Sequence, residues 1–102
     1  MKDLLRGVEI LATFELDRAN TENCPKFNSM HEGYAVLLEE IQEAEEELDR
    51  VKRKMNAVWG AVRRNEYPKD SIEMIEHCAK LVACEAIQVV AMAQKFINTF
   101  KE

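Results

Sequence analysis

The stretch that decides the fold is YAVLLEEIQEAEEELDRVKRKMNAVWGAV, residues 34–62. Apolar side chains recur in it at alternating intervals of three and four residues: Tyr34, Leu37, Ile41, Ala44, Leu48, Val51, Met55, Val58 and Val62. This spacing places them on one side of an α-helix, as in a coiled coil. Just before it, the run from Ser29 to Glu32 has the S-x-x-E pattern of a capping box, which satisfies free N–H groups at a helix start. The sequence therefore predicts one long helix from this point.

A second apolar series with the same intervals follows: Ile72, Ile75, Ala79, Val82, Ala86, Val89, Ala93, Phe96 and Phe100. The segment Asn65–Pro68 separates the two series, and Asp70–Glu73 offers a second capping box. Two matching seams joined by a short connection favour an antiparallel helical hairpin. We expect the connection within residues 61–67, centred near Arg64.

The chain before residue 29 predicts a shorter first helix over residues 2–19 and a linker over residues 20–28. The helix has an apolar stripe at helical spacing, formed by Leu4, Leu5, Val8, Leu11, Ala12 and Leu16. Phe27 is the one large apolar residue of the linker, so we expect it to be buried. The resulting fold is all-α, a single domain over residues 1–102 with a long-helix hairpin and an N-terminal helix. Because the last helix is apolar beyond its seam, we expect helical bundles on oligomerisation, as a homodimer or homotetramer.

The composition excludes several classes of protein. At 47% hydrophobic residues the chain can bury a core, and three Gly and two Pro are too few for a turn-rich β fold. With 14 basic and 19 acidic residues, the net charge of −5 disfavours binding to a nucleic acid polymer. The three cysteines show no CxxC spacing and are expected to be free core residues, and no apolar run suits a membrane. We expect a cytoplasmic protein.

Two pairs of polar residues lie on the same flank of the two long seams. Glu40 and Glu43 are three residues apart in the first series, and Glu85 and Gln88 occupy the equivalent positions in the second. The rest of that flank of the last helix is apolar, at Cys78, Leu81 and Met92. A buried carboxylate is costly without a partner or a cation, and oxygen ligands suit Mg²⁺. The spacing thus indicates a metal site between two helices, although a solvated acidic face has the same spacing.

The residues around both pairs resemble a known family. Residues 27–43 and 84–96 are similar to the two metal helices of the MazG-like all-α nucleoside triphosphate pyrophosphohydrolases, of the small bacterial and phage type. The family pattern is E-x-x-E followed by E-x-x-D; Glu40, Glu43 and Glu85 match it, and Gln88 stands where the family has Asp. The resemblance implies Mg²⁺ or Mn²⁺ held by these four residues, with Glu40, Glu43 and Glu85 catalytic. It further implies cleavage of (d)NTP to (d)NMP and pyrophosphate, as in house-cleaning of nucleotide pools.

Three further residues are candidates for contact with the nucleotide, each with a structural alternative. His31 can contact the nucleotide or only complete the capping turn. Tyr34 can stack on a base or pack in the core, where we also expect Trp59. Lys54 belongs to a basic block that can reach phosphates or remain solvated. The alternative for the whole chain is a non-catalytic helical module for interaction or oligomerisation.

Overall fold

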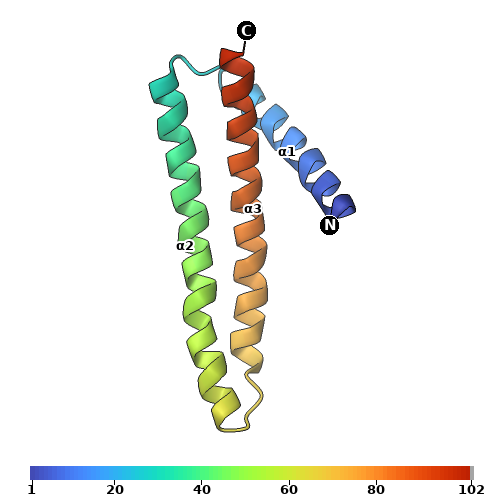
Figure 1. Ribbon diagram of the computed structural model, residues 1–102, viewed down its shortest axis with the longest axis vertical. Helices are drawn as coiled ribbons and strands as arrows, with labels where there is room; N and C mark the ends of the chain where they lie inside the picture. Colours follow the sequence, from blue (N-terminus) through green and yellow to red (C-terminus); the bar gives the residue numbers. More distant parts are fainter. Residues whose placement is uncertain (102) are drawn as a thin grey trace.

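The computed structural model describes residues 1–101 and contains three helices: α1 (Lys2–Glu22), α2 (Met30–Arg63) and α3 (Lys69–Phe100). As Figure 1 shows, α2 and α3 run antiparallel as a long hairpin, and α1 leans against the C-terminal half of α3. The molecule measures 59 × 29 × 22 Å, and residues 1–101 contain no strand. The predicted all-α hairpin with an N-terminal helix is confirmed.

The start of α2 uses the predicted cap, with one change of partner. The Ser29 hydroxyl accepts a hydrogen bond from the Glu32 backbone N–H at 3.1 Å. The Glu32 carboxylate accepts from the backbone and side-chain amides of Asn28, at 3.2 and 3.0 Å. The first bond occupies an N–H group that the helix start leaves free, and the two from Asn28 tie the end of the linker to the first turn of α2.

The connection between α2 and α3 comprises residues 64–68, so it begins three residues later and ends one residue later than predicted, because α2 continues to Arg63. Asn65 turns the chain with a φ of 57°, a left-handed conformation that Asn tolerates better than most residues. The prediction that Asp70 caps α3 is wrong, because the helix already begins at Lys69 and the Pro68 carbonyl accepts from the Ile72 N–H at 2.9 Å. Asp70 lies instead in the first turn, where the helix dipole favours a carboxylate.

The predicted seam of α2 consists of two rows of apolar residues, and only one of these rows packs against α3. One row lies half-buried along the hairpin, formed by Leu37, Ala44, Val51 and Val58 of α2 and Ile75, Val82, Val89 and Phe96 of α3. The other row of α2 is exposed, formed by Tyr34, Ile41, Leu48, Met55 and Val62. The position before each of these residues faces α3 in its place, at Gly33, Glu40, Glu47, Lys54 and Ala61. The prediction that Trp59 packs in the core is wrong, since it is 61% exposed, and the core alternative for Tyr34 fails too, since it is 66% exposed.

The core is concentrated at the end of the hairpin where the linker crosses α3. Phe27 is buried as predicted, and its ring lies 6.2 Å from that of Phe96, centroid to centroid. The Phe27 backbone N–H donates to the Thr99 hydroxyl at 3.2 Å, which ties the linker to α3. Ala91 and Met92 of α3 complete this core together with side chains of α1. The linker is therefore a fixed wall beside α3.

The first helix is three residues longer than predicted and is buried only along part of its length. Ala12, Leu16 and Ala19 pack toward α3, whereas Leu4 and Leu5 are more than half exposed. The first turns consequently project away from the hairpin (Figure 1).

The cysteines are free, as predicted, but only one lies in the core. Cys78 is buried, and Cys24 and Cys84 are exposed, so the prediction of three core cysteines is wrong for two of them. Across residues 1–101, no helix combines the length and the apolar character that crossing a membrane requires.

Candidate metal centre

Three carboxylates converge halfway along the hairpin. Glu40, Glu43 and Glu85 each offer one oxygen atom, and these oxygens all lie within 4.8 Å of one another. Glu40 and Glu43 share a face of α2 because residues three apart are neighbours on a helix surface. The antiparallel register, which also sets Gly33 against Phe96, brings Glu85 of α3 opposite them. The structure thus brings together the three glutamates that the sequence singled out.

The electrostatics of this cluster are unfavourable without a counter-charge. Burial raises the pKa of Glu40, and the negative charges of Glu43 and Glu85 raise it further. Burial also raises the pKa of Glu85, and the close approach of Glu43 adds to this effect. None of the three forms an ion pair with a basic side chain of residues 1–101. A proton or a cation is therefore needed to make the cluster stable.

The geometry fits a hard divalent cation. Ligand oxygens of octahedral Mg²⁺ lie about 2.1 Å from the ion, which places neighbouring oxygens about 3 Å apart and opposite ones about 4.2 Å apart. The observed limit of 4.8 Å is slightly wider, so small side-chain rotations would close the set. All three side chains are half-buried rather than sealed, which leaves coordination positions for water or phosphate.

Glu47 is a fourth carboxylate beside the cluster, and it is not among the site residues predicted from the sequence. Its side chain is 14% exposed; one oxygen pairs with Arg50, and the other is buried with no hydrogen-bond partner among residues 1–101. Its charge contributes to the raised pKa of Glu85. Glu47 follows Glu43 by four residues and Glu40 by seven, so helical spacing alone could have placed it here.

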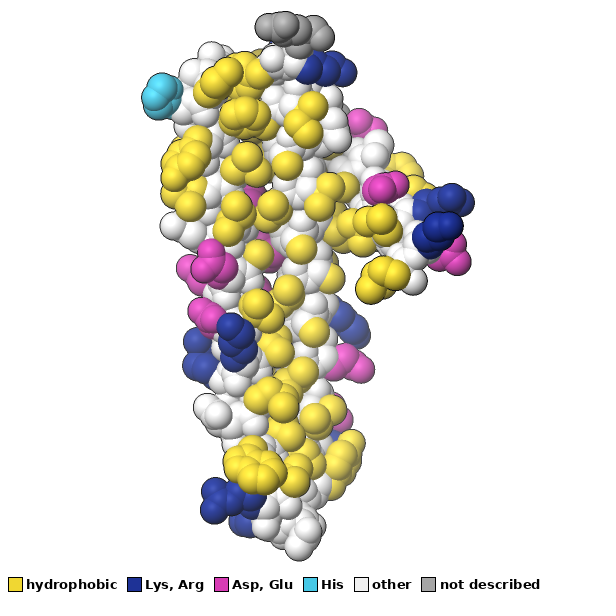
Figure 2. Space-filling model, viewed as in Figure 1, with side chains coloured by type: hydrophobic (Ala, Val, Ile, Leu, Met, Phe, Trp, Pro, Cys, Tyr) yellow, Lys and Arg dark blue, Asp and Glu magenta, His cyan; other side chains and the backbone are white. Residues whose placement is uncertain are grey.

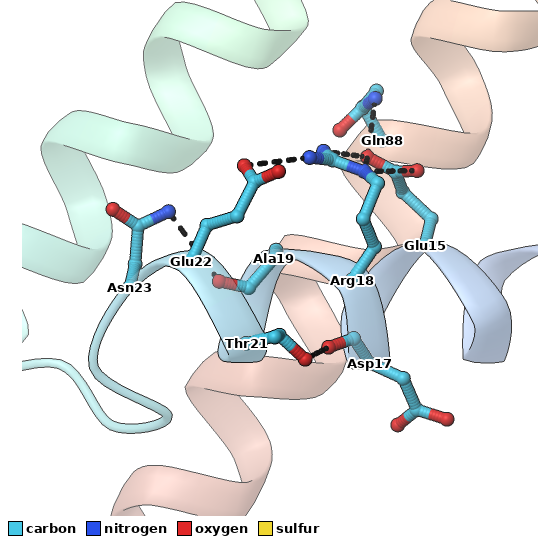
Figure 3. A network of polar contacts seen from close by, with 8 residues as sticks. All are labelled: Glu15, Asp17, Arg18, Ala19, Thr21, Glu22, Asn23 and Gln88. Carbon is cyan, nitrogen blue, oxygen red and sulfur yellow. Dashed lines mark hydrogen bonds and ion pairs between the residues drawn. The ribbon is translucent and has the colours of Figure 1, made fainter.

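Gln88 is held by the first helix. Its side-chain amide donates to a carboxylate oxygen of Glu15 at 2.7 Å, and Glu15 in turn pairs with Arg18 (Figure 3). Arg18 also pairs with Glu22 at 2.9 Å. Hydrogen bonding from Arg18, with a smaller effect from Gln88, lowers the pKa of Glu15 despite its partial burial. Gln88 is thereby turned toward α1, and its role as a metal ligand stays a prediction.

A cavity of about 450 Å³ adjoins the cluster at Glu40, which belongs to both, and Gln88 lines the cavity as well. Its other walls come from α1, the linker and α3, which supply three basic side chains: Arg18, Lys26 and Lys95. A cluster of carboxylates and a cavity with three cations thus meet at Glu40. This arrangement can hold a divalent cation and a polyanion side by side.

The predicted substrate contacts lie elsewhere. His31 and Tyr34 are exposed on the first turns of α2 and do not line this cavity. Lys54 lines a separate hollow further along the hairpin, together with Arg50, Arg53 and Cys78. The cations beside the cluster come from segments far from it in sequence, which helical periodicity cannot reveal.

Comparison with models of protein families gives no match. Comparisons with curated proteins and with solved structures give none either.

Proposed function

We propose that this chain is a divalent-metal-dependent nucleoside triphosphate pyrophosphohydrolase of the MazG-like type. The supporting observation is the convergence of Glu40, Glu43 and Glu85, with no basic partner among residues 1–101, at the wall of a cavity that contains three cations. Carboxylate sets of this kind on facing helices hold catalytic divalent ions in helical bundles. The reaction is hydrolysis of a (d)NTP to the corresponding monophosphate and pyrophosphate.

The glutamates of the cluster are expected to bind the cation and to act on the attacking water. Glu40, Glu43 and Glu85 would hold Mg²⁺ or Mn²⁺, with Gln88 as a further oxygen ligand if its amide turns from Glu15. When bound, the ion neutralises phosphate oxygens and lowers the pKa of a water molecule. Water attacks the α-phosphorus, the bond to the bridging oxygen breaks, and pyrophosphate leaves. Because Glu40 borders both the cluster and the cavity, we expect its carboxylate to accept the proton of the attacking water.

A screen of (d)NTPs with Mg²⁺ or Mn²⁺, which detects pyrophosphate separately from phosphate, tests the reaction. Glu43→Gln should reduce pyrophosphate release by about 100-fold or more, since even residues that only support metal ligands cost 10–100-fold when replaced. Glu45→Gln is the matched control because Glu45 is exposed on the same helix. Release of phosphate alone, or equal loss in both variants, would refute the proposal.

Metal binding is tested separately by thermal melting after removal of metal with EDTA. A ligand that binds only the folded state at 100 times its Kd adds about 2.7 kcal/mol to the free energy of unfolding. Millimolar Mg²⁺ or Mn²⁺ should therefore raise the Tm of the chain, and Glu43→Gln should abolish the rise. An unchanged Tm at millimolar metal would remove the basis for catalysis.

A non-catalytic interaction module is the second candidate. The observation in its favour is the exposed apolar row of α2, with Tyr34, Ile41, Leu48, Met55 and Val62 all at least 40% exposed. Such a row can bind a partner helix without any metal. An unchanged Tm with metal, together with absent pyrophosphate release, would favour this candidate.

A further inference from the structure

Lys95 is a largely buried basic residue that has no carboxylate partner among residues 1–101. It lies on α3, is only 7% exposed and lines the cavity beside the carboxylate cluster. Its ammonium group lies 4.7 Å from the centroid of the Phe27 ring, and it forms no ion pair with a carboxylate of residues 1–101. A cation–π contact offsets only part of the cost of taking an ammonium group out of water. An anion in the cavity would give the Lys95 ammonium group an ion pair in addition to this contact.

The same cavity collects two more basic side chains from other elements. Arg18 comes from α1, where Glu15 and Glu22 already share its charge. Lys26 comes from the linker and has no ion pair within residues 1–101. The hollow at Arg50, Arg53 and Lys54 also collects three basic side chains, and the cavity at Lys95 differs from it in sharing Glu40 with the metal cluster. Three cations around one cavity suit a multivalent anion rather than a single carboxylate.

The two carboxylates that line the cavity limit where an anion can lie. Glu32 is engaged at the linker side by the amides of Asn28. Glu40 belongs to the metal cluster, so its charge repels a free anion but attracts one that shares a cation with it. The apolar wall is restricted too, because Lys95 lies over the Phe27 ring and occupies the face on which a nucleobase would stack.

We propose that this cavity binds the pyrophosphate portion of the substrate, with Lys95 as its central contact. The identity of the anion rests on the proposed function, whereas the preference for a polyphosphate rests on the three cations. The α-phosphorus then lies next to Glu40 and the cluster, and the departing group lies toward Lys95. The volume of about 450 Å³ accommodates pyrophosphate together with water.

Calorimetric titration of the metal-free chain with inorganic pyrophosphate in EDTA tests this inference. Lys95→Met should weaken binding about tenfold or more, because it removes a charge-assisted hydrogen bond while it keeps the length of the side chain. Lys95→Arg should keep most of the affinity. The matched control is Lys80→Met, since Lys80 lies on the same helix, pairs with Glu76 and has a 72% exposed side chain.

Thermal melting shows whether a loss of pyrophosphate binding in Lys95→Met comes from a loss of folding. Lys95→Met should melt no lower than the unmodified chain without ligand, since it removes a buried charge, and pyrophosphate should no longer raise its Tm. Equal pyrophosphate affinity in Lys95→Met and the unmodified chain would overturn the inference, as would an equal loss in Lys80→Met.

Glu43→Gln separates this inference from the proposed function. In EDTA it should bind pyrophosphate at least as tightly as the unmodified chain, because it removes a negative charge beside the cavity, even where it releases none from a nucleotide. If the unmodified chain catalyses pyrophosphate release and Lys95→Met still binds pyrophosphate normally, the function stands and the inference fails. If metal binding and catalysis are absent but the loss in Lys95→Met is seen, the anion site stands without the function.

Discussion

At the scale of single residues, the raised pKa values of Glu40 and Glu85 make the stability of the metal-free protein depend on pH. In the unfolded chain both carboxyls titrate near the ordinary value of 4.5. As the pH falls from 7 toward 4.5, the folded state takes up protons before the unfolded chain does, so the free energy of unfolding rises. We expect the Tm in EDTA to increase over this range, as measured by circular dichroism.

Glu85→Gln is the control for this effect, since it removes one titrating group and reduces the charge around the other. Its Tm should depend less on pH than that of the unmodified chain between pH 7 and pH 4.5. Glu15 does not confuse the result, because its lowered pKa places its own loss of stability below 4.5. Identical pH profiles for both proteins would mean that the cluster holds no unfavourable charge.

A second prediction at this scale concerns the amide of Gln88. Gln88→Asp loses the hydrogen bond to Glu15 and places a carboxylate beside it, so the metal-free chain should lose about 1–3 kcal/mol of stability. The same variant should bind Mg²⁺ more tightly, because it adds a charge next to the cluster. The double variant Glu15→Gln with Gln88→Asp exchanges donor and acceptor and should recover part of the stability. Urea unfolding and metal titration of both variants and of the unmodified chain check both effects. No change in either measurement would place residue 88 outside both networks.

The same residues show which parts of the candidate site can be predicted from helical spacing and which cannot. Spacing alone placed Glu40, Glu43 and Glu85 on matching flanks, because a helix repeats regularly and the hairpin register is nearly symmetric about its connection. It could not predict the bond between Gln88 and Glu15, which are 73 residues apart. Lys95 was missed for the same reason, since its contact with Phe27 depends on the path of the linker.

At the scale of helical elements, Gly33 allows α2 and α3 to approach each other closely. A Cβ atom at Gly33 would lie 2.5 Å from the Phe96 ring and 3.1 Å from the Phe27 ring. Gly33→Ala should therefore displace both rings and cost about 1–3 kcal/mol, the usual cost of overpacking. Gly7→Ala is the matched control: nothing lies within 4 Å of its Cβ position, and helix propensity alone should make it neutral or stabilising by up to about 1 kcal/mol. The free energy of unfolding of both variants is measured in urea. Equal values would mean that α2 and α3 can move apart at Gly33 without cost.

The elements themselves were the most predictable part of the fold, because each rests on a long periodic pattern. Their boundaries moved by one to three residues where local hydrogen bonds decided, as at Lys69 and Glu22. The face that each helix presents was less predictable. Two adjacent rows of α2 could pack against α3. The small residues Gly33 and Ala61 favour the row to which they belong, which also carries Glu40 and Glu47.

At the scale of the whole molecule, the row that α2 packs against α3 decides which apolar row stays exposed. The exposed row of α2 has no partner among residues 1–101. Figure 2 shows hydrophobic side chains over most of one face, from the linker end to the connection. The row on α2 runs from Tyr34 to Val62, which corresponds to about 42 Å of helix, and each helix is about 10 Å wide. Both helices together therefore present about 800 Å², the area that each partner contributes to a stable interface.

We expect a second copy of the chain to cover this face, because a two-fold pairing of hairpins would place apolar rows of equal length against each other as a four-helix bundle. The mass by sedimentation at micromolar concentration should be at least twice 11.8 kDa. Leu48→Lys places a charge in the middle of the row and should yield the single-chain mass, while Glu45 one turn earlier keeps the helix favourable for a lysine. Leu4→Lys is the control, since Leu4 is 65% exposed on the free end of α1 and should leave the assembly intact. A mass of 11.8 kDa for the unmodified chain would show that the row serves another partner, and an unchanged assembly in Leu48→Lys would place the interface on a different face.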